Sequence, residues 1–225
     1  METVDRWTQE RLEMVENQIR RRGVRDTRVL DAMRRVPRHQ FLPPELHHLA
    51  YSDGPLPIGG GQTISQPYIV AAMTEFLHLT GEENVLEIGT GSGYQAAVLA
   101  ELCQSVHSVE FRPELSRRAG ETLARLGYQN IYLHIGDGSL GWKDAAPYQG
   151  ILVTAAAPSI PPPLIEQLDD GGRLVIPVGQ RGGQLLMVCE KHGDEVTSQA
   201  VMDVAFVPLR GEMGWDAEEW EHSFF

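Results

Sequence analysis

A turn with three glycines, Gly89, Gly91 and Gly93, constrains the fold of this chain more than any other stretch. It follows the apolar run 85–88 and precedes a helix that we predict over residues 95–103. Glycine is needed there because such a turn takes backbone angles that side chains forbid, and because a ligand can lie against bare backbone. In an open α/β sheet a turn of this kind sits at the carboxyl end of a strand, where ligands bind.

The spacing of the glycines indicates which ligand binds. A dinucleotide fingerprint, G-x-G-x-x-G counted from Gly89, needs a glycine at the position of Tyr94. The pattern present, Glu87-x-Gly89-x-Gly91-x-Gly93, resembles the first motif of Rossmann-like methyltransferases that use S-adenosylmethionine (AdoMet). AdoMet carries no phosphate. It needs close approach of backbone to its methionine part and a carboxylate for its ribose.

Acidic residues stand at the ends of the next two predicted strands. Glu110 ends the apolar strand 106–110, and a carboxylate there can accept hydrogen bonds from both ribose hydroxyls. Asp137 follows the strand 131–135 and is placed to accept from the amino group of an adenine. The alternative is an ordinary glycine-rich turn beside two solvated acids. Three successive strands that each end in the expected polar group favour the cofactor site.

The chain beyond the glycine turn predicts an α/β fold. Strands are predicted at 106–110, 131–135, 150–154 and 173–178, and helices at 113–126 and 163–168. Two further strands, 184–190 and 196–204, flank a charged turn and look like a hairpin. Alternating strands and helices predict a Rossmann-like fold, with a mostly parallel, seven-stranded sheet covered by helices on both faces. The hairpin predicts antiparallel strands at one end of this sheet.

The start of the chain predicts a helical layer that is added to this α/β core. One helix is predicted from residue 3 to residue 22, where Gly23 ends it, and a second begins at an Asp26 cap. A third, short helix is predicted over residues 44–49. Additions of this kind commonly roof an active site.

Segment 51–68 is too rich in glycine and proline for regular structure, and it is long for a connector. A long ordered loop in a compact domain is more often functional than not. It leads into a predicted helix, 66–79. On these residues alone Ser65 is best interpreted as the N-cap of that helix, although a serine at the helix mouth also faces the site.

Composition limits the class of protein. The 225 residues, 42% of them hydrophobic, suffice for one large domain. The net charge of −12 argues against nucleic-acid or membrane binding, no apolar run is long enough to span a bilayer, and the N-terminus is no signal peptide. Cys103 and Cys189 are expected to be buried free thiols in a reducing compartment, so we expect a cytoplasmic protein, and a monomer.

The single domain is expected to consist of a helical layer (1–57), an active-site loop and helix (58–80), an AdoMet-binding core (81–210) and an acidic tail (211–225).

Other catalytic chemistries lack their motifs. The histidines show no metal-ligand spacing, and neither a G-x-S-x-G nucleophile elbow nor a G-x-x-x-x-G-K-[ST] phosphate loop occurs. Methyl transfer needs no acid–base pair when the acceptor is already ionised, as a carboxylate is at neutral pH. The absence of a candidate base therefore points toward carboxyl methylation rather than toward an amine or phenol acceptor.

Several stretches together resemble one family, the protein-L-isoaspartate O-methyltransferases, from about residue 12 to residue 209. The resemblance is carried by His39 to Pro43, Ala50 to Gly59, Gly61 to Pro67, Val85 to Tyr94, Gly136-Asp137-Gly138 with Gly141-Trp142, Thr154 to Pro158, and Phe206 to Leu209. The glycine turn alone indicates only a methyltransferase. Segment 62–67 is the specific part, because AdoMet enzymes in general lack it. Gly60, a third glycine in the loop, and the tail after Gly214 depart from the family pattern.

The resemblance implies a reaction, a cofactor and a class of partner. The family uses AdoMet to methylate the abnormal free α-carboxyl of L-isoaspartyl residues in damaged proteins and peptides, and it also accepts D-aspartyl residues. These residues arise when asparagine deamidates or aspartate isomerises. The methyl ester then collapses to a succinimide, part of which reopens as normal aspartate.

The resemblance also implies roles for single residues. Ser65 matches the active-site serine of the family, which favours that role over a pure cap, and its hydroxyl would orient the substrate carboxylate. The positions that match cofactor contacts are Ile64, Gly89, Gly91, Gly93, Glu110, Asp137 and Gly138, and those that match substrate contacts are Thr63, Val207 and Leu209. No metal is expected.

Two other functions stay open at this point. One is a different AdoMet methyltransferase, which acts on a small molecule or RNA. The other is a non-catalytic module that binds AdoMet or a nucleotide. A preference for an altered peptide over RNA or metabolites as methyl acceptor distinguishes an isoaspartyl methyltransferase from the other methyltransferases. AdoMet binding without turnover indicates the non-catalytic module.

Overall fold

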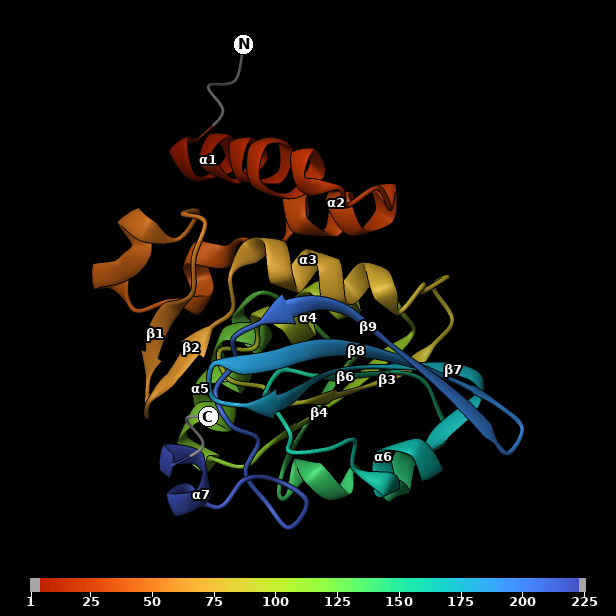
Figure 1. Cartoon of the computed structure of the whole chain (residues 1–225). Coiled ribbons are helices and arrows are strands. Elements are labelled where there is room, and N and C mark those ends of the chain that lie inside the picture. The colour runs from red at the N-terminus through yellow and green to blue at the C-terminus, as the bar shows by residue number, and fades with distance from the viewer. Residues whose placement is uncertain (1–4, 223–225) are drawn as a thin grey trace.

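The computed structural model describes residues 5–222, and one seven-stranded sheet forms its centre (Figure 1). The strands are β3 (Asn84–Ile88), β4 (Ser105–Glu110), β5 (Ile131–Ile135), β6 (Tyr148–Val153), β7 (Leu168–Gln180), β8 (Gly183–His192) and β9 (Glu195–Val204). Their order in space is β5-β4-β3-β6-β7-β8-β9, with parallel pairing from β5 to β7 and antiparallel pairing of β8 and β9. The predicted sheet is confirmed. Its strand order reverses direction at β3, which is where ligands bind in open α/β sheets.

Helices cover both faces of the sheet, more thickly on one than on the other. The thicker layer holds α3 (Pro67–Phe76), α4 (Tyr94–Ala100) and α5 (Pro113–Arg125). The short α6 (Pro162–Glu166) lies on the opposite face, near the 3₁₀ segment Gly138–Leu140 (Figure 1). The predicted helices on both faces are confirmed, with ends shifted by a few residues.

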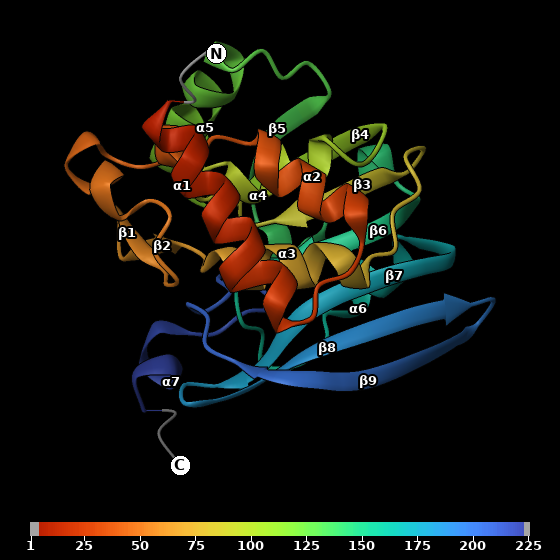
Figure 2. The ribbon, with the colours of Figure 1, turned by 90° about the horizontal axis from the view of Figure 1, so that it is seen from above.

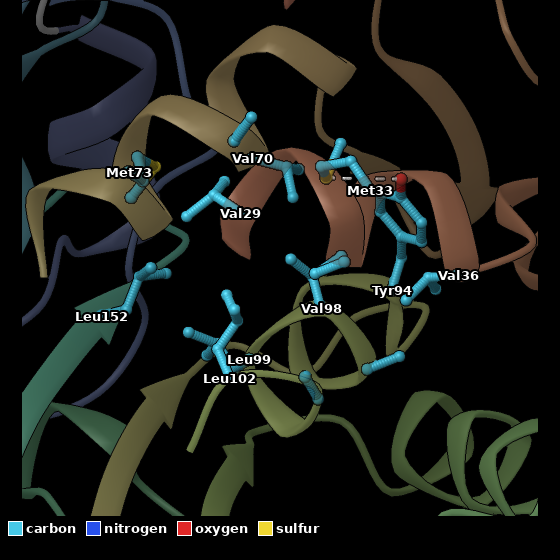
Figure 3. Close-up of a cluster of buried hydrophobic side chains, with 14 of the residues drawn as sticks. Val29, Met33, Val36, Val70, Met73, Tyr94, Val98, Leu99, Leu102 and Leu152 are labelled. Carbon is cyan, nitrogen blue, oxygen red and sulfur yellow. Dashed lines mark hydrogen bonds between the residues drawn. The ribbon is translucent and has the colours of Figure 1, made fainter. Parts of the chain in front are cut away.

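The larger hydrophobic core lies between the sheet and the helices above it. Figure 3 shows side chains from the N-terminal helices, α3, α4 and the sheet pointing toward one another. Val29, Met33, Val70, Met73, Val98, Leu99 and Leu152 are all almost completely buried there. Each such side chain contributes roughly 1.5–3 kcal/mol by leaving water. A second cluster, which includes Leu86, Ile88 and Ile151, fills the other face of the sheet.

The N-terminal layer lies across α3 and α4, as the view from above shows (Figure 2). α1 (Arg6–Met14) begins at an Asp5 cap and continues as a π-helical turn, Val15–Ile19, and a 3₁₀ turn, Arg20–Arg22. Gly23 ends it with φ of 110°. Asp26 caps α2 (Thr27–Arg35), accepting from the N–H groups of Arg28 and Val29. The predicted first helix with its Gly23 stop and the predicted Asp26 cap of the second helix are confirmed, although the predicted start at residue 3 lies outside the described residues. The 3₁₀ segments Arg38–Phe41 and Pro44–Leu49 complete the layer, the second where a short helix was predicted.

The prediction that segment 51–68 holds no regular structure is wrong. It contains a two-stranded antiparallel hairpin, β1 (Leu56–Gly59) and β2 (Gln62–Ile64), apart from the main sheet. Gly59, Gly60 and Gly61 all have positive φ, so the glycines that suggested a loop instead make the tight turn between two strands. The hairpin places Ile64 inward, where it is 3% exposed.

The C-terminal part adds two features that the sequence did not predict. Gly171 and Gly172, which precede the predicted strand 173–178, lie inside β7, and the tail forms a short helix, α7 (Ala217–His222). Cys103 and Cys189 are buried free thiols, as predicted. Within residues 5–222 the model has no helix with the length and apolar character that crossing a membrane would require.

Candidate active site

The glycine turn closes β3 and requires glycine at each of its three positions. Gly89, Gly91 and Gly93 have φ of 97°, 53° and 86°, in the left-handed region that side chains avoid. A Cβ at Gly89 would collide with the hydroxyl of Thr154, and one at Gly93 would come within 3.2 Å of Ala119. The turn is therefore shaped by close approach as well as by backbone angle.

Glu110 ends β4 beside this turn and is held by backbone. Its Oε2 accepts from the N–H of Gly91 at 2.8 Å and its Oε1 from the N–H of Arg112 at 3.0 Å. The side chain is 6% exposed, and it lines a cavity beside the glycine turn. A carboxylate has about four acceptor sites, so two backbone bonds leave lone pairs for the hydroxyls of a ligand.

Glu87 lies beneath the turn and is completely buried. One of its carboxyl oxygens accepts from the hydroxyl of Ser108, whose oxygen lies 2.6 Å from that of Thr90. Its other oxygen has no hydrogen-bond partner among the described residues. Burial raises the pKa of this carboxyl to about 8. Glu87 is therefore protonated at neutral pH.

The cavity that Glu110 lines lies at the carboxyl ends of β3, β4 and β6, beside the β1–β2 hairpin. It brings together nine residues that the sequence predicted, namely Thr63, Ile64, Ser65, Gly89, Gly91, Glu110, Gly138, Val207 and Leu209. Its space is about 810 Å³, counting the open mouth. We call it the cofactor cavity.

Two predicted cofactor residues, Gly93 and Asp137, do not line this cavity. Gly93 instead begins α4 behind the turn. The Asp137 carboxylate accepts from the N–H of Ser139 at 2.9 Å, from its hydroxyl at 2.6 Å, and from the N–H of Glu212 at 2.7 Å. It faces the C-terminal segment 209–215, which we call the strap. Any contact of Asp137 with an adenine stays a prediction.

The interpretation of Ser65 as the N-cap of α3 is wrong. Gln66 occupies the cap position, and no side chain caps the helix. Within residues 5–222 the Ser65 hydroxyl makes no hydrogen bond that would fix it to the protein. The hydroxyl is half-buried in the wall of the cavity and is free to bind a ligand.

A second hollow, which we call the groove, opens from the cofactor cavity toward the end of β9. Thr63, Ser65, Thr154 and Val207 line both hollows, so the two hollows adjoin at these residues, and we call this junction the passage. At the far end of the groove the Arg22 guanidinium lies 3.7 Å from the ring centre of Tyr68. Val207 is held in place by the main chain, since its carbonyl accepts from the N–H of Ala156 at 2.8 Å.

Sequence reasoning missed several residues that line the cofactor cavity. Phe111 and Arg112 directly follow Glu110 and line the cavity. Arg210 follows Leu209 in the strap. Thr154 stood in a motif to which no role was given. Their nearness to residues already predicted was the one signal that could have found them.

The cofactor cavity fits AdoMet on two observations. Its turn offers bare backbone, and the Glu110 carboxylate has free lone pairs. Among the described residues, no group of three or more histidine, cysteine, aspartate or glutamate side chains could hold a metal ion.

Comparison with known proteins gives one consistent result. Residues 9–214 match the model of the family described as protein-L-isoaspartate(D-aspartate) O-methyltransferase. The chain is similar to protein-L-isoaspartate O-methyltransferase 1 of Syntrophobacter fumaroxidans, at 56% identity over 90% of this chain and 95% of that protein. It is similar to a protein-L-isoaspartate O-methyltransferase of Methanoculleus marisnigri, at 57% identity over 93% of this chain and 95% of that one. A solved protein-L-isoaspartate O-methyltransferase superposes with a TM-score of 0.81 at 28% identity, over 92% of this chain and 67% of that chain.

Proposed function

The chain belongs to the protein-L-isoaspartate(D-aspartate) O-methyltransferase family, and from this premise we propose how its own residues carry the reaction. It uses AdoMet to methylate the free α-carboxyl of L-isoaspartyl residues in proteins and peptides. The single observation that carries our assignment is the passage between the cofactor cavity and the groove. A methyl group must cross from one to the other, and the passage is lined by Thr63, Ser65, Thr154 and Val207.

On the cofactor side we propose that Glu110 accepts the ribose hydroxyls. The turn from Gly89 to Gly93 approaches the methionine part with bare backbone, and Ile64 closes over the cofactor from the hairpin. Gly138 lines the far end of the cavity, with Asp137 directly before it. These roles rest on the cavity lining and on the free lone pairs of the Glu110 carboxylate.

On the substrate side we propose that Ser65 orients the carboxylate. Its hydroxyl is uncommitted, faces the passage, and can donate one hydrogen bond to a carboxylate oxygen. Thr63, Val207 and Leu209 shape the walls that receive the peptide. The substrate carboxyl is ionised at neutral pH, so the chain needs no general base, and positioning supplies most of the rate.

When bound, AdoMet supplies an electrophilic methyl: a carboxylate oxygen bonds to its carbon while the carbon–sulfur bond breaks, the electron pair stays on sulfur, and no proton moves. The resulting ester is activated toward attack by the neighbouring backbone nitrogen, which gives a succinimide and releases methanol. Hydrolysis of the succinimide returns part of the chain to normal aspartate. We propose that this sequence is the purpose of the reaction, and that D-aspartyl residues are acceptors as well.

The cellular setting is also a proposal. Two buried free thiols and a net charge of −12 support a protein that works in the cytoplasm, without nucleic acid and as a monomer.

The test is methyl transfer from labelled AdoMet to three acceptors offered separately. They are an isoaspartyl peptide, the same peptide with normal aspartate, and transfer RNA. We expect label in the isoaspartyl peptide alone. Label in the RNA, or equal label in both peptides, would show that the acceptor is another carboxyl or another class of molecule.

A further inference from the structure

Thr154, like Ser65, stands where the cofactor cavity meets the groove. It directly follows the last residue of β6, so it belongs to the rigid sheet rather than to the hairpin. Its backbone N–H donates to the carbonyl of Ile88 at 2.9 Å. The side chain is therefore fixed to the end of the neighbouring strand β3.

The Thr154 hydroxyl has lone pairs that the protein does not use. Its Oγ1 lies 2.6 Å from the carbonyl oxygen of Gly89 and 3.0 Å from that of Ile88. Both carbonyls can only accept, so the one hydroxyl proton points toward them. Among the described residues no donor binds to this oxygen. Two lone pairs remain, on a side chain that lines the cofactor cavity.

We propose that Thr154 is a further residue of the methyl-transfer site, whose oxygen recognises the positively charged sulfonium of AdoMet and holds it in line with the carboxylate at Ser65. The proposal rests on the proposed function for the position of the reacting groups. A hydroxyl whose proton is committed to a carbonyl presents the negative end of its dipole, which attracts a cation. The Ile88 and Gly89 carbonyls beside it add the same sign of partial charge.

A purely structural role is the competing explanation. Thr154 supports the glycine turn through the same two carbonyls, and this alone would explain why it packs against Gly89. The two roles differ in what they predict for ligands. Loss of support for the turn weakens the binding of every ligand of the cavity. Loss of sulfonium recognition weakens only the binding of a ligand that carries the positive charge.

The experiment compares AdoMet with S-adenosylhomocysteine, which lacks both the methyl group and the positive charge. Calorimetry gives the two dissociation constants for the parent, Thr154→Val and Thr154→Ser. We expect Thr154→Val to lower the affinity for AdoMet by about tenfold, which corresponds to the loss of one interaction with a charged group. The affinity for S-adenosylhomocysteine should stay nearly unchanged. Thr154→Ser keeps the oxygen and should keep the parent ratio of the two constants.

Turnover gives a second readout. With saturating AdoMet and isoaspartyl peptide, kcat of Thr154→Val should fall by about tenfold while KM for the peptide stays near the parent value. Thr197→Val is the matched control, because Thr197 is exposed on β9 and the chemical change is identical. If thermal melting shows Thr154→Val to be unfolded, Thr154→Ala takes its place with the same expected ratio.

An equal loss of affinity for both ligands, or an unchanged ratio of the two constants, would overturn the proposal in favour of turn support alone. The binding comparison needs no peptide. A parent enzyme that discriminates the two ligands through Thr154 but never methylates an isoaspartyl peptide would therefore overturn the proposed function and leave this inference standing.

Discussion

At the scale of single residues, Ser65 shows how a local rule gave a reasonable but wrong interpretation. A serine before an apolar helix is a good N-cap by composition, yet Pro67 begins α3 one residue later than a Ser65 cap requires. The hydroxyl is thus left free at the passage. Only the resemblance to a family, and not helix chemistry, indicated this role from the sequence.

Because Ser65 caps nothing, Ser65→Ala should leave the free energy of unfolding close to that of the parent. It should slow methyl transfer by about tenfold or more, since an in-line displacement is sensitive to misplacement. Ser65→Asp should also fold and should be almost inactive, because its charge repels the incoming carboxylate. Denaturant unfolding and initial rates measure both effects. A folded Ser65→Asp enzyme with the turnover of the parent would contradict the role in orientation.

Glu87 predicts a dependence of stability on pH. Burial raises the pKa of its carboxyl from 4.5 to about 8, so the folded state holds a proton that the unfolded state releases. The stability that this proton contributes is complete below pH 4.5 and is lost as the pH rises to about 8. Its slope is at most about 1.4 kcal/mol per pH unit.

The neutral amide of Glu87→Gln removes this titration. Unfolding in urea at several pH values between 5 and 8 should therefore give a flatter curve for Glu87→Gln than for the parent. Parallel curves for the two proteins would show that Glu87 is not protonated in the folded state.

At the scale of elements, the sequence predicted regular strands and helices better than it predicted what glycine-rich segments do. The periodic patterns of β4, β5 and α5 gave their bounds almost to the residue. Gly59 to Gly61 were interpreted as part of a loop but form the turn of a hairpin, and Gly171 and Gly172, left outside the predicted strand 173–178, lie within β7. A glycine in the sequence indicates that unusual backbone angles are allowed at that position. It does not indicate with which strand the flanking residues pair.

The strap is the second element that the sequence left open. Asp137 binds it through the N–H of Glu212, and Ser139 binds it through the N–H of Met213 at 3.0 Å. Gly211 has φ of 127°, and a side chain there would collide with Asp137. A hydrogen bond between residues so far apart in the chain has no signature in either local sequence, so the strap could not be predicted.

Asp137→Ala should release the strap, because the carboxylate accepts from the N–H of Glu212 and also holds the Ser139 hydroxyl that accepts from the N–H of Met213. We expect trypsin to cleave after Arg210 faster than in the parent, since this bond lies at the strap's start. Asp194→Ala, at the exposed turn between β8 and β9, is the control. Equal rates of cleavage for all three proteins would show that Asp137 does not hold the strap.

At the scale of the whole molecule, the alternation of strands and helices was enough to predict the sheet, its direction and its antiparallel end. The carboxyl ends of parallel strands meet at one edge, so Glu110 and the glycine turn could be placed together from sequence alone. The groove could not be predicted from the sequence. It joins the end of β9 to the N-terminal layer through Arg22, and this depends on packing between distant segments.

The whole chain should also distinguish its cofactor from a dinucleotide. A ligand that binds the folded state raises the melting temperature according to its affinity. Because the turn has Tyr94 where a dinucleotide fingerprint has glycine, AdoMet should raise the melting temperature clearly more than NAD at equal concentration. Equal shifts would contradict the assignment of the cavity.

The conversion of an isoaspartyl peptide tests the central claim most directly. The peptide is incubated with the enzyme and AdoMet over several cycles of ester formation and hydrolysis, and chromatography with mass spectrometry follows each form. The account predicts that the methyl ester appears first, then the succinimide, and then a growing share of the normal aspartyl peptide, all dependent on AdoMet. An isoaspartyl peptide that stays unmodified while AdoMet is bound, or a methyl group found at another position of the peptide, would contradict it.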